Sequence, residues 1–434
     1  MTEASGRAQA PSGPPNESLW RLFRRFLRFG ALAWGGPVAQ IAMIREALVE
    51  DERWISSERF NRVLGVYQAL PGPEAHELCV YFGMLSRGRP GAIVAGLGFM
   101  LPGLLLMLAL SWCYVEFGLG SSLWRGAMIG CQGAVTALIV RAVLQIGRHA
   151  LTTRALWSLG FAAVVAQAAG VNGVAVLAIA GVLHAVWDRA AHWVGRARSA
   201  LAFAPAIPAS GGGDGWIVPD FRAPARAVAT FVHDSSANVM TVLVQPLVQS
   251  IAHQSSILLP SIPTLFGSGL RAGLLTFGGA YTAIPFLRAD AVVTGRWMSD
   301  AQFVDGLALS SILPAPFIIF STFVGYVGGG LVGALVLTAG VFLPAFGFTL
   351  IGHETLERVV ERPGAHAFLD GITAAVVGVI AVTAWTVGRG VLTSPVAIGT
   401  FVLALVALLR YRAPTTVAWV MVAAAVLGIV GETL

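Results

Sequence analysis

The second half of this chain repeats the first half with its helix-breaking residues in register. Trp34-Gly35-Gly36 is matched by Phe277-Gly278-Gly279, and Leu70-Pro71-Gly72-Pro73 is matched by Leu313-Pro314-Ala315-Pro316. Both pairs have the same offset of 243 residues (34 to 277, 71 to 314), so no gap separates them. In an apolar chain, a duplication of this kind is typical of secondary transporters, in which two related bundles enclose a central site.

The composition indicates that most of the helices face lipid. Apolar residues make up 56% of the chain and charged residues only 12%, with a mean hydropathy of +0.75, whereas a soluble domain carries about 25% charged residues. Stretches such as Pro90 to Val115 lack charged side chains for longer than the ~20 residues that one crossing needs. We therefore expect an all-α polytopic membrane protein of about 13 transmembrane helices.

The sequence predicts four parts. Residues 1–18 are rich in Pro, Ser and Gly, which predicts a disordered cytoplasmic tail. Residues 19–192 form the first six-helix repeat and 263–434 the second, and 193–262 form a linker with an extra crossing. Within the repeats, the segments near 22–44, 62–86, 264–287 and 303–327 are predicted as crossings that contain the helix breaks.

Arginine placement predicts that the repeats have opposite orientations. Arg residues favour the loops on the N-terminal side in the first half and the alternate loops in the second half. Since basic loops stay in the cytoplasm, this swap indicates an inverted repeat with a cytoplasmic N-terminus. An inverted repeat needs an odd number of crossings before it, which is why 193–262 should supply one more.

Each half carries one Gly-Gly break and one Pro-x-Pro break. Proline removes a backbone donor and clashes with the preceding turn, and non-helical backbone at membrane depth persists only where protein or a wet cavity satisfies it. A half-helix that begins there suits an anion. A kink that only shapes packing is the alternative, but pairing across the repeat favours a substrate site. Its predicted residues are Gly35, Gly36, Pro37, Pro71, Gly72, Pro73, Gly278, Gly279, Pro314 and Pro316.

Two arginines and three titratable residues lie close to these breaks. Arg28 and Arg271 stand seven residues before the Gly-Gly pairs; a buried Arg needs an anionic partner, and an oxyanion would serve. Snorkelling to the interface is the alternative. Glu74, His76 and Glu77 follow Pro73 and have apolar counterparts in the second half, which predicts an ion-coupling element. They would instead be simply solvated if the segment opened to water.

The motifs resemble the chromate ion transporter family in its long, two-domain form. The residues that carry the resemblance are Phe29-Gly30, Trp34-Gly35-Gly36-Pro37, Gln68-Ala69-Leu70-Pro71-Gly72-Pro73-Glu74-Ala75-His76, Leu101-Pro102-Gly103 and Thr276-Phe277-Gly278-Gly279. The resemblance adds Gln68 to the predicted substrate-binding residues. It implies a bacterial inner-membrane protein that exports chromate, driven by the proton motive force. The second half departs from the pattern at Ala280 and Ala315.

Several alternatives stay open at this point. Chromate and sulfate are both tetrahedral dianions of similar size, so the residues alone predict only an oxyanion. An anion channel would use the same breaks without needing Glu74 or His76, whereas a membrane enzyme would need a nucleophile, metal or redox cluster. The sequence shows no metal-ligand spacing, phosphate-binding loop or nucleophile triad. We therefore expect no catalytic residue, no cofactor and no nucleic-acid partner; a homodimer is left open.

Overall fold

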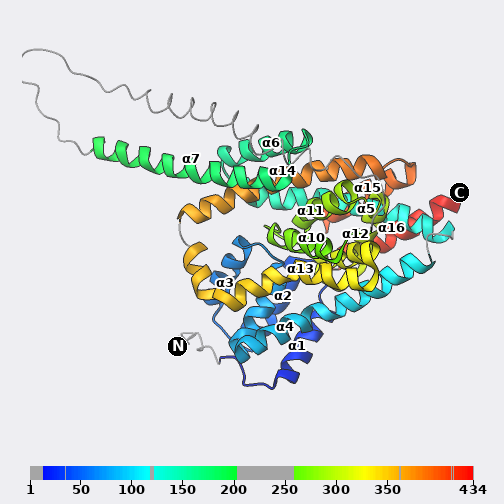
Figure 1. Ribbon diagram of the computed structural model, residues 1–434, viewed down its shortest axis with the longest axis horizontal. Helices are drawn as coiled ribbons and strands as arrows, with labels where there is room; N and C mark the ends of the chain where they lie inside the picture. The colour runs from blue at the N-terminus through cyan, green and yellow to red at the C-terminus, as the bar shows by residue number, and fades with distance from the viewer. Residues whose placement is uncertain are drawn as a thin grey trace, which may run out of the picture. The chain divides into compact units, whose positions relative to one another are not determined.

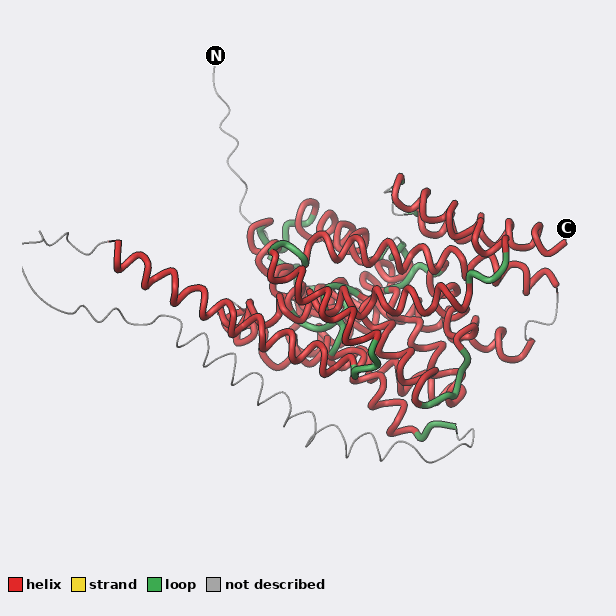
Figure 2. Tube along the Cα trace, turned by 90° about the horizontal axis from the view of Figure 1, so that it is seen from above, coloured by secondary structure: helices red, strands yellow, loops and turns green. Residues whose placement is uncertain are grey.

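The structure is a computed structural model that describes residues 13–34, 36–117, 122–202, 259–360, 363–411, 413 and 415–433. All regular structure in these ranges is helical (Figure 2). Up to His192 and again from Leu259, the described residues belong to one compact unit. Most of the predicted linker with its extra crossing (193–262), and most of the predicted tail (1–18), lie outside the described residues.

The α-helices and π-helices follow the same order in both halves, and the second half adds two short 3-10 helices. Figure 1 labels the α-helices along the chain. The first half contains α1 (Leu19–Ala31), α2 (Pro37–Arg45), the π-helix η1 (Glu46–Asp51), α3 (Ser57–Ala69), α4 (Glu74–Phe117), α5 (Ser122–Ala150), α6 (Arg154–Ala168) and α7 (Gly173–Ala202). The second half contains α10 (Ile262–Leu274), the short 3-10 helix η3 (Ala280–Ala283), α11 (Ile284–Arg288), the π-helix η4 (Ala289–Thr294), α12 (Asp300–Ile312), the 3-10 helix η5 (Phe317–Ile319), α13 (Phe320–Val360), α14 (Pro363–Val391), α15 (Pro395–Arg410) and α16 (Thr416–Thr433).

Unusual backbone geometry recurs at matching positions of the two halves. A π-helix precedes Arg53 in the first half and Arg296 in the second, and these two are the non-glycine residues with positive φ among those described, at 54° and 51°. A serine then caps the next helix in each case, Ser56 for α3 and Ser299 for α12. Left-handed backbone is costly for a side chain that carries Cβ, so the shared strain indicates that both halves fold locally in the same way.

Both α4 and α13 are antiparallel hairpins rather than straight helices. In α4 the backbone leaves helical geometry at Arg87 and Gly88. The rings of His76 and Phe99 lie only 6.4 Å apart, although a straight helix would separate them by about 34 Å. In α13, Gly330 has φ 59° and the Thr322 hydroxyl lies 2.8 Å from that of Thr338. Each hairpin therefore has a short limb (74–87 or 320–329) and a long limb (89–117 or 331–360).

In the first half, the outer ends of the short helices return to the same place. Arg25 of α1 forms an ion pair with Glu52, which follows η1. The hydroxyl of Ser86 donates a hydrogen bond to the Pro15 carbonyl (3.2 Å), and the guanidinium of Arg87 donates one to the side-chain oxygen of Asn16 (2.6 Å). The start of α1, the turn after η1 and the turn of α4 thus lie together at one end of the bundle.

The second half has the same arrangement around its own turns. A Cβ added to Gly328 would lie 2.9 Å from the Trp297 ring and 3.2 Å from Leu265. This places the turn of α13, the turn before α12 and the first turn of α10 side by side.

The segments 22–44, 62–86, 264–287 and 303–327, predicted as crossings that contain the breaks, are each divided into separate helices at Gly-Gly or Pro-x-Pro. The helices that end at the breaks have 13 residues each and are about 20 Å long, which is shorter than the ~30 Å hydrocarbon core. The chain then turns back, since the ring of Phe60 in α3 lies 6.4 Å from that of Phe82 in α4. The described residues contain five helices long and apolar enough to cross a membrane, and they include α5, α14, part of α7 and the hairpins α4 and α13. The protein is thus an all-α, multi-pass membrane protein.

Candidate functional site

The four breaks of the two halves meet inside the bundle. The backbone N–H of Gly72 donates a hydrogen bond to the Thr276 carbonyl (2.8 Å). The side-chain amide of the buried Gln40 donates to both the Ala33 carbonyl (3.0 Å) and the Ala315 carbonyl (3.1 Å). Ala33 and Thr276 occupy matching positions of the repeat, as do Gly72 and Ala315 (33 to 276, 72 to 315). Each Gly-Gly break is therefore tied to the Pro-x-Pro break of the other half.

Glycine and proline at the first break are required by the backbone. Gly36 precedes α2 with φ 82° and ψ −176°, and its counterpart Gly279 has φ 114°. Only glycine adopts such angles readily. Pro37 then starts α2, where its missing N–H costs nothing. Gly35 lies outside the described residues.

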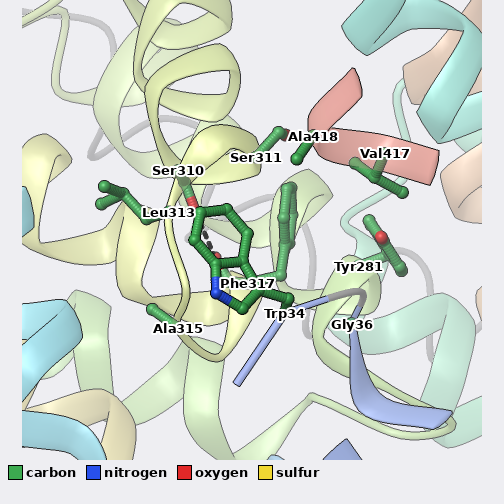
Figure 3. A pocket seen from close by; sticks show the side chains of 10 residues that line it. All are labelled: Trp34, Gly36, Tyr281, Ser310, Ser311, Leu313, Ala315, Phe317, Val417 and Ala418. Carbon is green, nitrogen blue, oxygen red and sulfur yellow. Dashed lines mark hydrogen bonds between the residues drawn. The ribbon is translucent and has the colours of Figure 1, made fainter. Parts of the chain in front are cut away.

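A small pocket opens between the Gly-Gly break of the first half and the Pro-x-Pro break of the second. Figure 3 shows the Trp34 indole in the middle of its lining side chains. The Tyr281 ring packs on Phe317 with centroids 4.5 Å apart, and its hydroxyl would lie 3.8 Å from a Cβ added to Gly36. The lining residues are Trp34, Gly36, Tyr281, Ser310, Ser311, Leu313, Ala315, Phe317, Val417 and Ala418.

The hydroxyl groups of the two serines in the pocket donate hydrogen bonds to backbone carbonyls of α12 and of the break that follows it. Ser310 Oγ donates to the Phe317 carbonyl (2.9 Å), the contact drawn in Figure 3, and Ser311 Oγ donates to the Leu307 carbonyl (2.7 Å). Two side-chain oxygens and the Tyr281 hydroxyl therefore give the pocket polar groups in otherwise apolar surroundings.

Arg141 does not line this pocket and was not among the predicted site residues, but its charge reaches a residue that does. It is half-buried in α5, a helix apolar enough to cross the membrane, and its charge acts on the hydroxyl of Tyr281. In the described part of the chain Arg141 forms no ion pair with an acidic side chain. The signal was present in the sequence, because Arg141 is the one charged residue between Arg125 and Arg148. An ionisable residue inside a membrane span is by default a candidate for function.

The predicted arginines Arg28 and Arg271 do not line the pocket. Both lie in the last turn of a half-length helix, α1 or α10. Arg271 forms an ion pair with Asp290, whose carboxylate also accepts a hydrogen bond from Ser268 (2.6 Å). Ala47 occupies the position that matches Asp290, and among the described residues Arg28 has no acidic partner. The two arginines thus have matching positions but different electrostatic surroundings.

Glu74, His76 and Glu77 begin the short limb of α4 and are buried. A Cβ on Gly72 would lie 2.5 Å from a carboxylate oxygen of Glu77, so that carboxylate rests directly on the Pro-Gly-Pro break. The His76 ring lies 4.8 Å from the rings of both Phe342 and Phe346. These side chains are enclosed by protein, which disfavours the simple solvated alternative.

Several buried polar atoms of these side chains have no hydrogen-bond partner among the described residues. Among the described residues, neither nitrogen of His76 and neither carboxylate oxygen of Glu77 has a hydrogen-bond partner. The Gly96 backbone lies close to the imidazole but outside hydrogen-bond geometry. Buried polar groups without partners are rare and costly. Gln68, one turn before the break, is exposed.

Comparison with known proteins identifies the family. The family model described as "Chromate transporter" matches residues 20–187 and again 263–429. The chain belongs to the chromate transporter family. The family model matches once in each predicted repeat and leaves out residues 188–262.

Three relatives illustrate the similarity within the chromate transporter family. A chromate transport protein of Pseudomonas aeruginosa is 50% identical over 372 residues, 85% of this chain and 81% of the relative. A chromate transport protein of Cupriavidus metallidurans is 30% identical over 84% of this chain and 82% of its own length. A probable chromate transport protein of Synechococcus elongatus is 28% identical over 91% and 90%, respectively. No solved structure matches the chain.

The asymmetry between Arg28 and Arg271 leads to a stability prediction. Arg271→Gln should lower the Tm of the purified protein in detergent, because it leaves the buried Asp290 carboxylate without its cation. The double variant Arg271→Gln/Asp290→Asn should regain most of the loss. Arg28→Gln is the matched control and should leave the Tm unchanged. Equal Tm values for Arg28→Gln and Arg271→Gln would contradict a stabilising ion pair.

Proposed function

We propose that this protein exports chromate across the bacterial inner membrane in exchange for protons, and that chromate binds where the four breaks meet. The observation that carries the proposal is the paired contact of the breaks, Gly72 with Thr276 and Gln40 with Ala33 and Ala315. Transporter sites are built from discontinuous helices at a repeat interface. The names of the relatives supply chromate as the substrate.

The groups around the crossing suit a tetrahedral dianion. The N-terminus of α2 begins at Pro37, and half-helix N-termini favour negative charge. Tyr281 supplies a hydroxyl. Arg141, whose charge acts on that hydroxyl, would supply a guanidinium, and charge-assisted hydrogen bonds are the strong ones. The predicted binding residues that frame this site are Gly36, Pro37, Pro71, Gly72, Pro73, Gly278, Gly279, Pro314 and Pro316.

We propose that Arg28 attracts chromate along the access path to the site. It stands in the last turn of α1, close to the break rather than at the outer end of the helix, and it is exposed. A charged side chain at such depth faces a water-filled cavity rather than lipid. Arg271 holds the matching position on the other side, where Asp290 neutralises it. The access paths next to Arg28 and Arg271 would therefore attract an anion to different extents.

The proposed topology places the two halves in opposite orientations, with the N-terminus in the cytoplasm. The long limb of α4 is about 43 Å long. At one end, the turn at Arg87 contacts Asn16 of the first half. Near the other end, Tyr114 contacts Asp305 in the outer half of α12. The short helices would thus enter from opposite faces of the membrane and meet at the midplane, as expected for an inverted repeat.

Cysteine labelling tests this topology. In a variant that lacks Cys79, Cys113 and Cys131, new cysteines at Ser57 and Arg89 should react with an impermeant maleimide from the same face of the membrane. Cysteines at Thr294 and Leu331 should react from the opposite face. A topology in which 62–86 is a single crossing places Ser57 and Arg89 on opposite faces, so that labelling pattern would contradict the out-and-back arrangement.

Everted membrane vesicles test the function itself. Vesicles that contain the protein should accumulate chromate when respiration acidifies their lumen, and an uncoupler should abolish the accumulation. Sulfate added in excess shows whether the site distinguishes the two dianions. Chromate flux that is saturable but ignores the uncoupler would favour an anion channel, and the absence of chromate uptake would overturn the proposed substrate.

A further inference from the structure

A second buried carboxylate lies away from the central crossing. Asp305, in the outer half of α12, is 1% exposed. The Tyr114 hydroxyl donates a hydrogen bond to one of its oxygens (2.7 Å), and the Gln132 side-chain amide donates to the other (2.7 Å). The three side chains come from α12, α4 and α5, so the carboxylate joins helices of both halves. Its counterpart in the first half is Arg62, which is exposed.

No cation compensates this carboxylate within the described residues. The titratable groups that face it are Tyr114 from α4 and Cys131 from α5. From α13, Phe323 covers the Tyr114 ring with centroids 5.0 Å apart. The described parts of α14 and α16, which also pack on α12, place no charged group against it. An ionised carboxylate held only by neutral donors in a buried site is energetically costly. Binding a proton or another cation would therefore stabilise Asp305.

Gln132 connects the carboxylate to a cavity. The same side chain that donates to Asp305 lines a pocket between α5, the first turn of α12 and the turn between α14 and α15. Its polar lining residues are Gln132, Asp300, Thr393 and Ser394. Asp300 and Ser394 lie at helix N-termini, so the pocket opens at the outer end of these helices. Only the Gln132 side chain would separate water in this pocket from Asp305.

We propose that Asp305 is a proton-binding site that is loaded from this pocket and coupled to the central site through α12. The inference rests on the proposed function, because it assigns one place where the driving proton binds. The proton adds to one carboxylate oxygen, and the Tyr114 hydroxyl, which donates to the ionised form, then turns to accept. A metal cation fits less well, since Tyr114 and Gln132 both present hydrogens rather than oxygens to the carboxylate.

The helix α12 gives the coupling a physical route. It carries Asp305 in its outer half and Ser310 and Ser311, which line the central pocket, at its inner end. The distance along the axis from Asp305 to Ser310 is about 8 Å. Protonation changes the hydrogen bonds that hold α12 to α4 and α5, and a shift of α12 moves the wall of the central pocket. Substrate access and proton binding would thereby be linked.

The test uses purified full-length protein in liposomes and two measurements of chromate flux. One is uptake driven by an imposed pH gradient, and the other is exchange of labelled for unlabelled chromate at equal pH. Asp305→Asn should lower driven uptake about tenfold or more, while exchange stays within about twofold of wild type. Loss of both fluxes to the same extent would overturn the proposal and leave Asp305 as a structural link. Undiminished driven uptake would overturn it too.

A second variant guards against misfolding of Asp305→Asn. Tyr114→Phe keeps the carboxylate but removes one donor to its ionised form, so the pH at which driven uptake is half-maximal should rise. A structural role would lower flux without moving this pH, and an unmoved profile overturns the proposal. Uptake driven by a sodium gradient at equal pH would identify sodium rather than the proton as the driving ion and would overturn the proposal. Wild-type protein that carries out neither flux would refute the proposed function rather than this site.

Discussion

Arg141→Gln is expected to abolish high-affinity chromate binding and transport while the protein still inserts into the membrane. The charge of Arg141 acts on Tyr281, which lines the pocket at the crossing, and no acidic side chain among the described residues forms an ion pair with Arg141. Loss of one partner from a buried, hydrogen-bonded charge pair costs about 2–5 kcal/mol. That range corresponds to a loss of affinity of roughly 30-fold to several thousand-fold. Calorimetry with chromate on purified protein measures the effect directly.

Two variants make the Arg141 result specific. Arg148→Gln removes an exposed arginine from the last turn of the same helix and should leave chromate binding intact. Arg141→Lys keeps the charge but loses the planar fork of donors, so it should retain part of the affinity. Wild-type affinity in Arg141→Gln would place the anion away from this pocket.

The sequence located the breaks but not the direction of the chain after them. Helices stop at Ala31, Ala69, Leu274 and Ile312, next to the Gly-Gly and Pro-x-Pro motifs, because paired prolines disrupt a helix and glycine destabilises one. Whether the next helix continues or turns back depends on contacts such as Arg25 with Glu52 and Arg87 with Asn16. Hydropathy reports only that a segment is apolar, so two half-length helices read as one crossing.

Long-range partners explain the remaining gaps in the sequence-based prediction. Asp305 is recognisable as a buried acid only once Tyr114 and Gln132 are beside it, and these lie 191 and 173 residues away. Arg271 looked identical to Arg28 because the residue that distinguishes them, Asp290, is 19 positions further along the chain. Arg141, in contrast, was detectable as an isolated charge in an apolar span. The prediction of the substrate site concentrated on breaks and arginines that recur in both halves, and Arg141 does not recur.

The position of Glu77 at the break leads to the prediction on coupling. Glu77→Gln and His76→Ala should reduce transport driven by a pH gradient much more than they reduce chromate binding. The Glu77 carboxylate rests against Gly72, whose N–H holds the Thr276 carbonyl of the other half. Gaining or losing a proton there alters a contact between the two halves without removing a group from the pocket lining. His76, enclosed by Phe342 and Phe346, is the neighbouring titratable group.

Binding and driven flux must be measured on the same preparations for this distinction to be meaningful. Calorimetry gives the chromate affinity, and liposomes with an imposed pH gradient give the driven flux. Glu58→Gln is a suitable control, because that carboxylate is exposed beside Arg62 and should change neither quantity. If Glu77 is a coupling residue, the Glu77→Gln variant still binds chromate but no longer converts the pH gradient into transport. Equal losses of affinity and driven flux in Glu77→Gln would instead make Glu77 part of the binding site or of its scaffold.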